Sequence, residues 1–143
     1  MSSQNAVLLS IRPKYAQKIF NGTKTVELRR TCPRVQKGNL VLVYVSSPVK
    51  ALAGFFKISQ IIKETPERLW HLVGPDAGIS KPEFDNYYSG AAIGFGICID
   101  RVRRLNNPVS LEWLKVKWPG FLPPQSFCYI GRPKVRFDSQ AAR

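Results

Sequence analysis

Between residues 24 and 30 the sequence carries polar side chains of different chemistry: Lys24, Thr25, Glu27, Arg29 and Arg30. Glu27 is the only acidic residue within the first 63 positions. A lysine beside a carboxylate can act as an acid/base pair, whereas a glutamate and an arginine together can hydrogen-bond the edge of a nucleobase. We therefore predict a functional site here, with Lys24 and Glu27 as candidate catalytic residues. The alternative is a structural ion pair.

Three further candidates precede this stretch. Arg12 and Lys14 would contact phosphate groups, or else only solvate the exposed face of a helix. Tyr15 would stack on a base, or else pack in the core, which is the commoner role of such a residue.

Polar residues at predicted strand ends complete the candidate site. Ser46, Ser47 and Ser126 would supply hydroxyl groups to a cleft, or else form turns. Gln125 follows two prolines and could read a base edge. The full predicted nucleic-acid-binding set is Arg12, Lys14, Tyr15, Lys24, Thr25, Glu27, Arg29, Arg30, Ser46, Ser47, Gln125 and Ser126.

The charge of the chain is strongly positive and unevenly distributed. Its 143 residues carry a formal net charge of +13. Residues 1–63 hold 11 basic residues and one acid, residues 64–100 hold two and six, and residues 101–143 hold nine and two. If the two basic ends meet in space, they form one positive face that attracts polyanions. We expect RNA or another nucleic acid or nucleotide as partner, and not a membrane surface, because no basic amphipathic helix of adequate length is visible.

Other classes of site lack their characteristic residues. The three cysteines lie far apart without paired spacing, and His71 is the single histidine, in an apolar context. Glycine-rich phosphate loops and zinc motifs are absent. We therefore expect no metal and no cofactor. Without a signal-peptide pattern or a run of apolar residues long enough to span a bilayer, we expect a cytoplasmic protein.

The N-terminal part of the sequence predicts the strands and the helix that position the candidate site residues. Residues 6–11 are apolar and predict a strand. Pro13 suits the first turn of a helix that Gly22 ends, with Tyr15, Ala16, Ile19 and Phe20 on one apolar face. The period then changes to two, so that Val26 and Leu28 point one way while Thr25, Glu27 and Arg29 point the other.

The remaining chain predicts more strands, separated by short helices. We expect a buried central strand at 39–46, a strand with a bulge near Gly54 at 51–62, and strands at 91–104 and 126–130. Capping residues predict helices from Thr65 to Val73, from Ser80 to Tyr88, and after Ser110 over 111–117. Glycines on one face of 91–104 suggest tight curvature or the close approach of another backbone. These elements predict a single α+β domain over 1–143, a small mixed β-barrel with short peripheral helices and a basic, frayed tail at about 132–143.

The sequence resembles ASCH domains, a branch of the PUA-like superfamily. The resemblance rests on SIRPKYAQKIFNGTKTVELRR at 10–30, and extends through YVSSP at 44–48, TPERLW at 65–70, AGISKPEFDNYYSG at 77–90 and PPQSF at 123–127. It implies a PUA-like pseudobarrel with peripheral helices and a cleft beside the first helix. Related PUA-like domains bind RNA or modified bases, and some ASCH-like proteins cleave RNA or hydrolyse acylated cytidine nucleosides.

The resemblance also bears on single positions. Lys24 stands at the lysine of the amidohydrolase-type members, but Glu27 stands where those members have a candidate threonine nucleophile, which disfavours amide hydrolysis. Those members also use a glutamate from the later helical region, for which Glu64 or Glu67 is the nearest candidate.

Three hypotheses of function follow. The first is an RNA- or nucleotide-binding domain with a basic cleft. The second is a metal-independent hydrolase, either a ribonuclease or an acylated-cytidine amidohydrolase, that uses Lys24 and Glu27. The third is a transcriptional or adaptor regulator that binds a small ligand or a protein.

Overall fold

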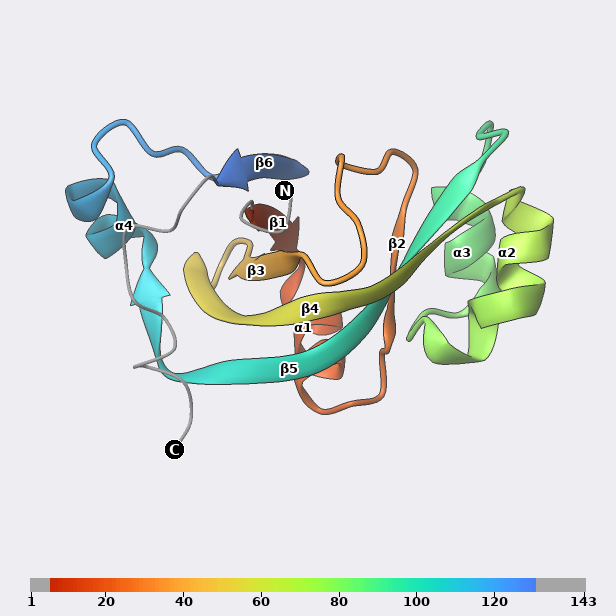
Figure 1. The fold of residues 1–143 in the computed structure, drawn as a ribbon, viewed down its shortest axis with the longest axis horizontal. Coiled ribbons are helices and arrows are strands. Elements are labelled where there is room, and N and C mark those ends of the chain that lie inside the picture. The colour runs from red at the N-terminus through yellow and green to blue at the C-terminus, as the bar shows by residue number, and fades with distance from the viewer. Residues whose placement is uncertain (1–5, 131–143) are drawn as a thin grey trace.

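The computed structural model describes residues 6–130, in which six strands form one mixed sheet (Figure 1). The strands lie in the order β2-β5-β4-β3-β1-β6. Their bounds are β1 Ala6–Ile11, β2 Val26–Arg29, β3 Leu40–Val45, β4 Ala51–Glu64, β5 Gly94–Ser110 and β6 Phe127–Ile130. β1 and β3 are parallel, and the other neighbouring pairs are antiparallel. The sheet curls into a half-barrel, which confirms the predicted mixed barrel with peripheral helices.

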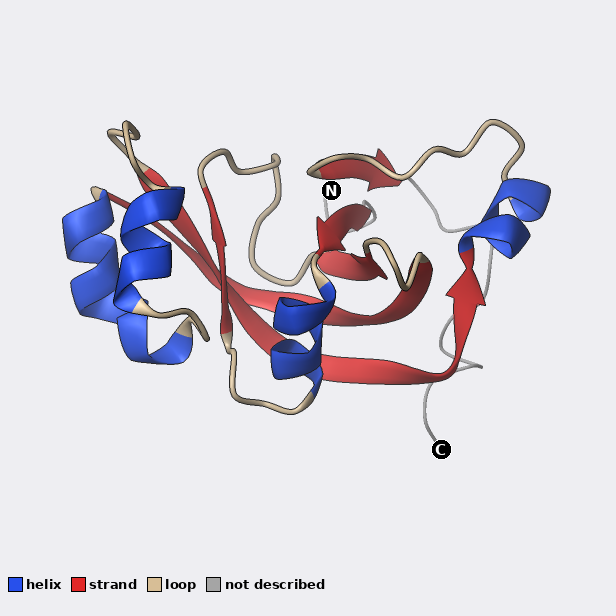
Figure 2. Ribbon diagram, turned by 180° about the vertical axis from the view of Figure 1, so that it is seen from behind, coloured by secondary structure: helices blue, strands red, loops and turns tan. Residues whose placement is uncertain are grey.

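Four short α-helices accompany the sheet within residues 6–130. They are α1 Pro13–Phe20, α2 Pro66–Val73, α3 Lys81–Tyr87 and α4 Leu111–Lys117, with a 3-10 turn, η2, at Gly74–Asp76. Figure 2 shows α2 and α3 together at one end of the sheet, α4 at the other, and α1 between them. No helix of this described part is long and apolar enough to cross a bilayer.

The predicted helix caps are confirmed. Thr65 and Ser110 accept hydrogen bonds from backbone N–H groups in the first turns of α2 and α4. Ser80 and Glu83 form a reciprocal capping box at the start of α3. Each cap satisfies a backbone donor that the helix itself leaves unpaired, so these short helices begin where the sequence places them.

The interior of the curled sheet is an aliphatic and aromatic core. Leu9, Val43 and Phe56 are fully buried there, and α1 adds Ile19 to the same cluster. Gly22, with a φ of +87°, ends α1 as predicted. This packing anchors a helix of only eight residues, which would be marginal alone, and so holds its first turn beside β1.

β5 is longer than predicted. It begins at Gly94 and continues to Ser110, because the 14-residue β4 pairs with it from Glu64↔Gly94 to Ala51↔Ser110. The ladder contains register shifts, one of them beside Gly54. At each shift the pairing skips a residue, so the regular alternation by which a strand is recognised in a sequence is interrupted. The predicted bulge near Gly54 is thereby confirmed.

Of the two causes expected for the glycines of β5, the close approach of another backbone is wrong. A Cβ at Gly94 would meet the side chains of Tyr88 and Leu69, and one at Gly96 would meet Val26. These glycines therefore admit side chains of α2, β2 and the end of α3, not another backbone. The close backbone approach lies at Gly54 instead, where a Cβ would meet the carbonyl oxygen of Arg103.

The first and last described strands are neighbours. β1 pairs antiparallel with β6, from Ala6↔Ile130 to Leu9↔Phe127. Within the described residues, the two basic segments of the sequence, 1–63 and 101–143, are therefore in contact through β1 and β6. The predicted tail at about 132–143 lies outside the described residues.

Candidate functional site

A pocket of about 510 Å³ opens where β1, β2, α3 and the segment before β6 converge. We call it the candidate pocket. Of the residues predicted from the sequence, those that line it are Arg12, Tyr15, Lys24, Glu27, Arg29, Ser46, Gln125 and Ser126. Residues separated by as many as 114 positions in the chain thus share one concave surface.

The alternation of β2 sends two charged side chains into this pocket. Val26 and Leu28 pack with Leu69 and Phe84 on the opposite side, in a core cluster shared with α2 and α3. Because side chains alternate along a strand, Glu27 and Arg29 must then face the pocket.

Three buried charges form the floor of the pocket. Glu27 Oε2 accepts hydrogen bonds from Arg29 Nε at 3.0 Å and lies 2.9 Å from Arg29 Nη2. Lys24 Nζ lies 3.6 Å from Glu27 Oε1 and donates to the carbonyl oxygen of Ala77 at 2.5 Å. All three residues are at most 7% exposed. A buried ion cluster is a costly way to stabilise a fold, which favours a functional reason for this one.

Burial changes the ionisation of Lys24. Removal of the ammonium group from water lowers the pKa of Lys24, and the attraction of the Glu27 carboxylate opposes this shift without cancelling it. Lys24 is therefore closer than an exposed lysine to giving up its proton, which suits an acid/base role.

Arg29 connects β2 to β1 and to the residue that precedes β6. Its Nη1 donates to Ser126 at both the backbone oxygen, 3.3 Å, and Oγ, 3.0 Å, and its Nη2 donates to the Ser10 carbonyl oxygen at 3.1 Å. Together with the contacts to Glu27, these bonds engage all three nitrogen atoms of the guanidinium group. Arg29 thus braces the pocket through contacts to Glu27, Ser10 and Ser126, and its expected role toward a ligand stays a prediction.

Basic residues of the first helix lie at the rim. Lys14 Nζ donates to Glu83 Oε2 at 2.8 Å, and the Tyr15 hydroxyl lies 3.4 Å from the same oxygen. Hydrogen bonds from Lys14 and from Ser80 lower the pKa of Glu83 to about 2. Arg12 is exposed at the pocket and forms no ion pair within residues 6–130, so it is the cation best placed to meet a phosphate.

Four predicted residues lie outside the pocket lining. Lys14 is at the rim, and Ser47 is exposed in the turn after β3. Thr25 is exposed just before β2, and its N–H donates to the Asp76 carbonyl oxygen at 2.9 Å. Arg30 is exposed, with Nη1 donating to the Tyr87 carbonyl oxygen at 3.2 Å and the Ser89 carbonyl oxygen at 3.4 Å.

One wall of the pocket was missed in the sequence. Ile79, Glu83, Asn86 and Tyr87 line it, at spacings that place them on one side of α3 and its leading turn. These positions were not predicted because residues 64–100 carry a net negative charge, which is unfavourable for binding a polyanion. Glu83, and not Glu64 or Glu67, is the helical-region glutamate that reaches the pocket. The spacing that places these residues on one side of a helix was visible in the sequence. That this side faces β1 and β2 across a pocket was not.

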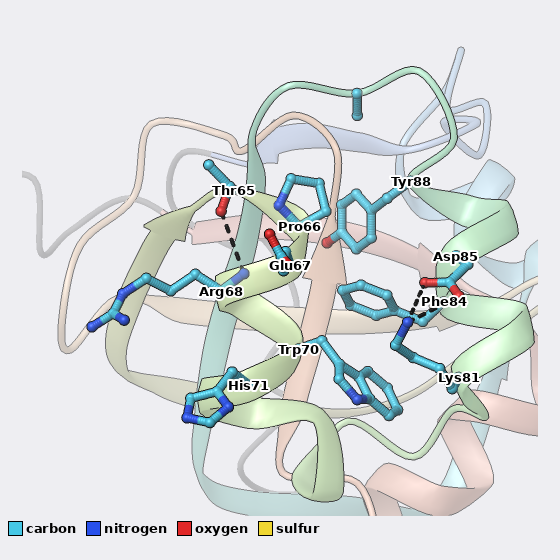
Figure 3. A pocket seen from close by; sticks show the side chains of 11 residues that line it. Thr65, Pro66, Glu67, Arg68, Trp70, His71, Lys81, Phe84, Asp85 and Tyr88 are labelled. Atoms are coloured by element: carbon cyan, nitrogen blue, oxygen red, sulfur yellow. Dashed lines mark hydrogen bonds and ion pairs between the residues drawn. The ribbon is translucent and has the colours of Figure 1, made fainter.

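A larger hollow of about 1070 Å³ lies between α2 and α3 (Figure 3). Trp70 and Phe84 contact each other in it with ring centroids 4.9 Å apart, and Lys81 pairs with Asp85 at 2.9 Å. Glu67 lines this hollow, and Glu64 pairs with Arg68 beside it at 3.7 Å. None of the predicted nucleic-acid-binding residues lines it, so the smaller pocket is the better candidate site.

Metal ligands do not gather at either place. Over residues 6–130 there is no group of three or more histidine, cysteine, aspartate or glutamate side chains that could hold a metal ion. The three cysteines are unpaired and partly buried.

Comparisons with known proteins relate the chain to one family. The sequence profile of the ASCH domain matches residues 9–97. An ASCH domain-containing ribonuclease from Zymomonas mobilis is 28% identical over 129 residues, which cover 90% of this chain and 86% of that protein. The large ribosomal subunit protein uL22 of Ureaplasma parvum is 31% identical over 115 residues, and the match spans only 37% of its length.

Solved structures show the same likeness. The crystal structure of ASCH from Zymomonas mobilis has a TM-score of 0.83, with 28% identity over 87% of each chain. The N-terminal domain of Staphylothermus marinus McrB has a TM-score of 0.56 with 14% identity, covering 90% of this chain and 89% of its own. The second likeness is one of fold alone.

Proposed function

The chain belongs to the ASCH domain family, and from that premise we propose that it binds RNA, with one nucleotide seated in the candidate pocket. Arg12 is the exposed cation at the pocket, and Lys14 lies at its rim. Ser126 accepts from Arg29 through Oγ, and no group within residues 6–130 accepts a hydrogen bond from its hydroxyl, which can therefore donate to a ligand. The likeness to a protein named as a ribonuclease supports RNA as the partner.

The observation that carries the proposal is the buried Lys24–Glu27–Arg29 cluster at the floor of an open pocket. Apolar residues of similar size would stabilise the fold at least as well. A polar floor that is already oriented by internal hydrogen bonds can instead recognise the edge of a base without further rearrangement.

The test is a titration of single-stranded RNA followed by fluorescence anisotropy at increasing salt. Phosphate contacts release counterions, so the logarithm of the affinity should fall linearly with the logarithm of the salt concentration. Arg12→Ala should reduce that slope by ~0.7, the value for one lost contact to a single strand. Lys115→Ala removes the same charge from exposed α4 and should leave the slope unchanged. An affinity that is independent of salt contradicts the proposal, and a protein partner retained after nuclease and high salt would favour an adaptor instead.

The second candidate function is metal-independent hydrolysis, and the lowered pKa of Lys24 favours it. Lys24 and Glu27 would then share the proton transfers, with Glu83 at the pocket rim as a further carboxylate. RNA and an acylated cytidine should be incubated with the protein in chelator, and products followed by chromatography. Lys24→Ala should abolish turnover; undiminished turnover in that variant excludes the assigned role.

A further inference from the structure

Tyr87 is an aromatic side chain in the pocket wall that neither the charge pattern nor the family likeness assigns. It is the last residue of α3 and is 37% exposed. It lines the candidate pocket together with Glu27 and Arg29. An aromatic ring beside a polar floor is the arrangement by which proteins hold an unpaired base.

The ring of Tyr87 is held rigidly. Its hydroxyl accepts from the Arg30 N–H at 3.2 Å and lies 3.4 Å from the Leu28 carbonyl oxygen, to which it donates. The Tyr88 ring contacts it edge-on, with centroids 4.8 Å apart and an interplanar angle of 72°. The Arg30 side chain also bonds the Tyr87 carbonyl oxygen. A ring fixed in this way loses little conformational entropy when a ligand stacks on it.

The ring of Tyr15, the stacking candidate from the sequence, is already in contact with cations of the protein. The ammonium groups of Lys14 and Lys24 lie 5.5 Å and 5.3 Å from the centroid of its ring. Its hydroxyl is directed to Glu83. No such cation contact involves the Tyr87 ring within the part of the chain that is described. Tyr87 therefore offers the better platform of the two.

We propose that Tyr87 is the platform on which an unpaired RNA base stacks in the candidate pocket, which makes single-stranded RNA the substrate class. This inference rests on the proposed function. A base within a duplex is stacked on both sides and its edge is paired, so it cannot also stack on a ring of the pocket wall. The polar edge of the stacked base would face Glu27 and the Ser126 hydroxyl, which line the same pocket.

The test moves one abasic nucleotide through every position of a short single-stranded RNA and measures each affinity by fluorescence anisotropy. With the wild-type protein, one position should cost about tenfold in affinity, the scale of a single base stacked on an aromatic residue. Tyr87→Leu should bind the intact RNA about tenfold more weakly and show no position that is sensitive to base removal. A duplex of the same sequence should compete poorly with the wild-type protein.

Two further variants separate stacking from a structural role. Tyr87→Phe keeps the ring but loses the hydroxyl contacts, and it should retain the position-dependent loss. Tyr129→Leu is the matched control, because Tyr129 is also exposed and its hydroxyl also accepts from a backbone N–H, that of Arg34. It should behave as the wild type does. Circular dichroism establishes that each variant is folded.

The outcomes distinguish the two proposals. If the wild-type protein binds RNA in a salt-dependent way but no abasic position matters, or if Tyr87→Leu keeps the wild-type pattern, the platform is refuted and RNA binding stands. If Tyr87→Leu does not fold, the wild-type scan still tests the platform, because a scan without any sensitive position refutes it. If the wild-type protein shows no salt-dependent binding, the proposed function itself is overturned.

Discussion

At the scale of single residues, the pocket floor is a balance between buried opposite charges. Glu27 is the one carboxylate that faces both Lys24 and Arg29, at 3.6 Å and 2.9 Å. Loss of one member leaves an uncompensated charge in a region of low polarity, which costs more than the intact cluster contributes. Substitutions here should therefore change stability as well as function.

Glu27→Gln should lower the free energy of unfolding by about 3 kcal/mol, because two buried cations lose their counter-charge. Urea denaturation followed by circular dichroism measures the change. The control is Glu64→Gln, which breaks an exposed pair with Arg68 and should cost less than about 1 kcal/mol. Equal effects of the two variants would show that the floor is not a buried ion cluster.

Lys24 should make stability depend on pH. Its pKa is lower in the folded protein than the ordinary value of 10.5, so between these two values the unfolded chain binds more protons and stability rises with pH. Comparison with Lys24→Met removes the contributions of other groups. The stability of the wild-type protein relative to this variant should increase as the pH rises toward 10.5 and level off above it, measured by urea denaturation. A difference that stays constant would contradict the lowered pKa.

At the scale of elements, the seven residues of α3 contribute both to the core and to the pocket wall. Its buried side holds Phe84 against Leu28 and Leu69, while its other side forms the pocket wall with Glu83 and Tyr87. A helix of seven residues is held by its cap and by packing. The capping box of Ser80 therefore helps to hold the pocket-lining residues of α3 in place.

Ser80→Ala should cost about 1 kcal/mol of stability and should also weaken RNA binding, because the wall that carries Tyr87 loosens. Ser110→Ala is the matched control: it removes an equivalent cap from α4, which lies at the opposite end of the sheet (Figure 2). It should cost a similar amount of stability without changing affinity. Thermal denaturation and anisotropy measure the two quantities. Equal losses of affinity would show that α3 has no special place in the site.

At the scale of the whole molecule, the pocket exists because the sheet curls until its two edge strands approach each other. β2 and β6 stand at opposite ends of the strand order and are not paired with each other in the described ladder. Arg29 spans the opening between them, from Glu27 on β2 to Ser126 and Ser10. The gap between the edge strands of the incomplete barrel is thus lined by polar side chains and forms the candidate pocket.

Arg29→Lys should loosen this closure, because a single ammonium group cannot reproduce the forked contacts of a guanidinium group. Hydrogen exchange of the β6 amides should become about tenfold faster, while the amides of central β3 should change much less. Arg104→Lys is the control, since Arg104 is exposed and lies over the Phe20 ring. Unchanged exchange in β6 would show that Arg29 does not join the edges.

Much of this architecture was predictable because its causes are local. The caps at Thr65, Ser80 and Ser110 act on the next turn of the same helix. The alternation that separates Val26 and Leu28 from Glu27 and Arg29 follows from strand geometry alone. The length of β5 was not predictable in this way, because its pairing with β4 passes through register shifts.

The sequence by itself determined which short segments become helices and strands, and which side chains of β2 share a face, since these depend on neighbours within a few residues. Only the tertiary structure decided that Arg29 would hydrogen-bond Ser10 and Ser126 and that Tyr87, from an acidic segment, would line the same pocket. Both outcomes depend on contacts between distant residues, such as Arg29 with Ser126, 97 positions apart, and Arg30 with Tyr87, 57 positions apart. The physical reason is that hydrogen-bond donors and ring faces have no assigned partner until distant strands and helices have packed.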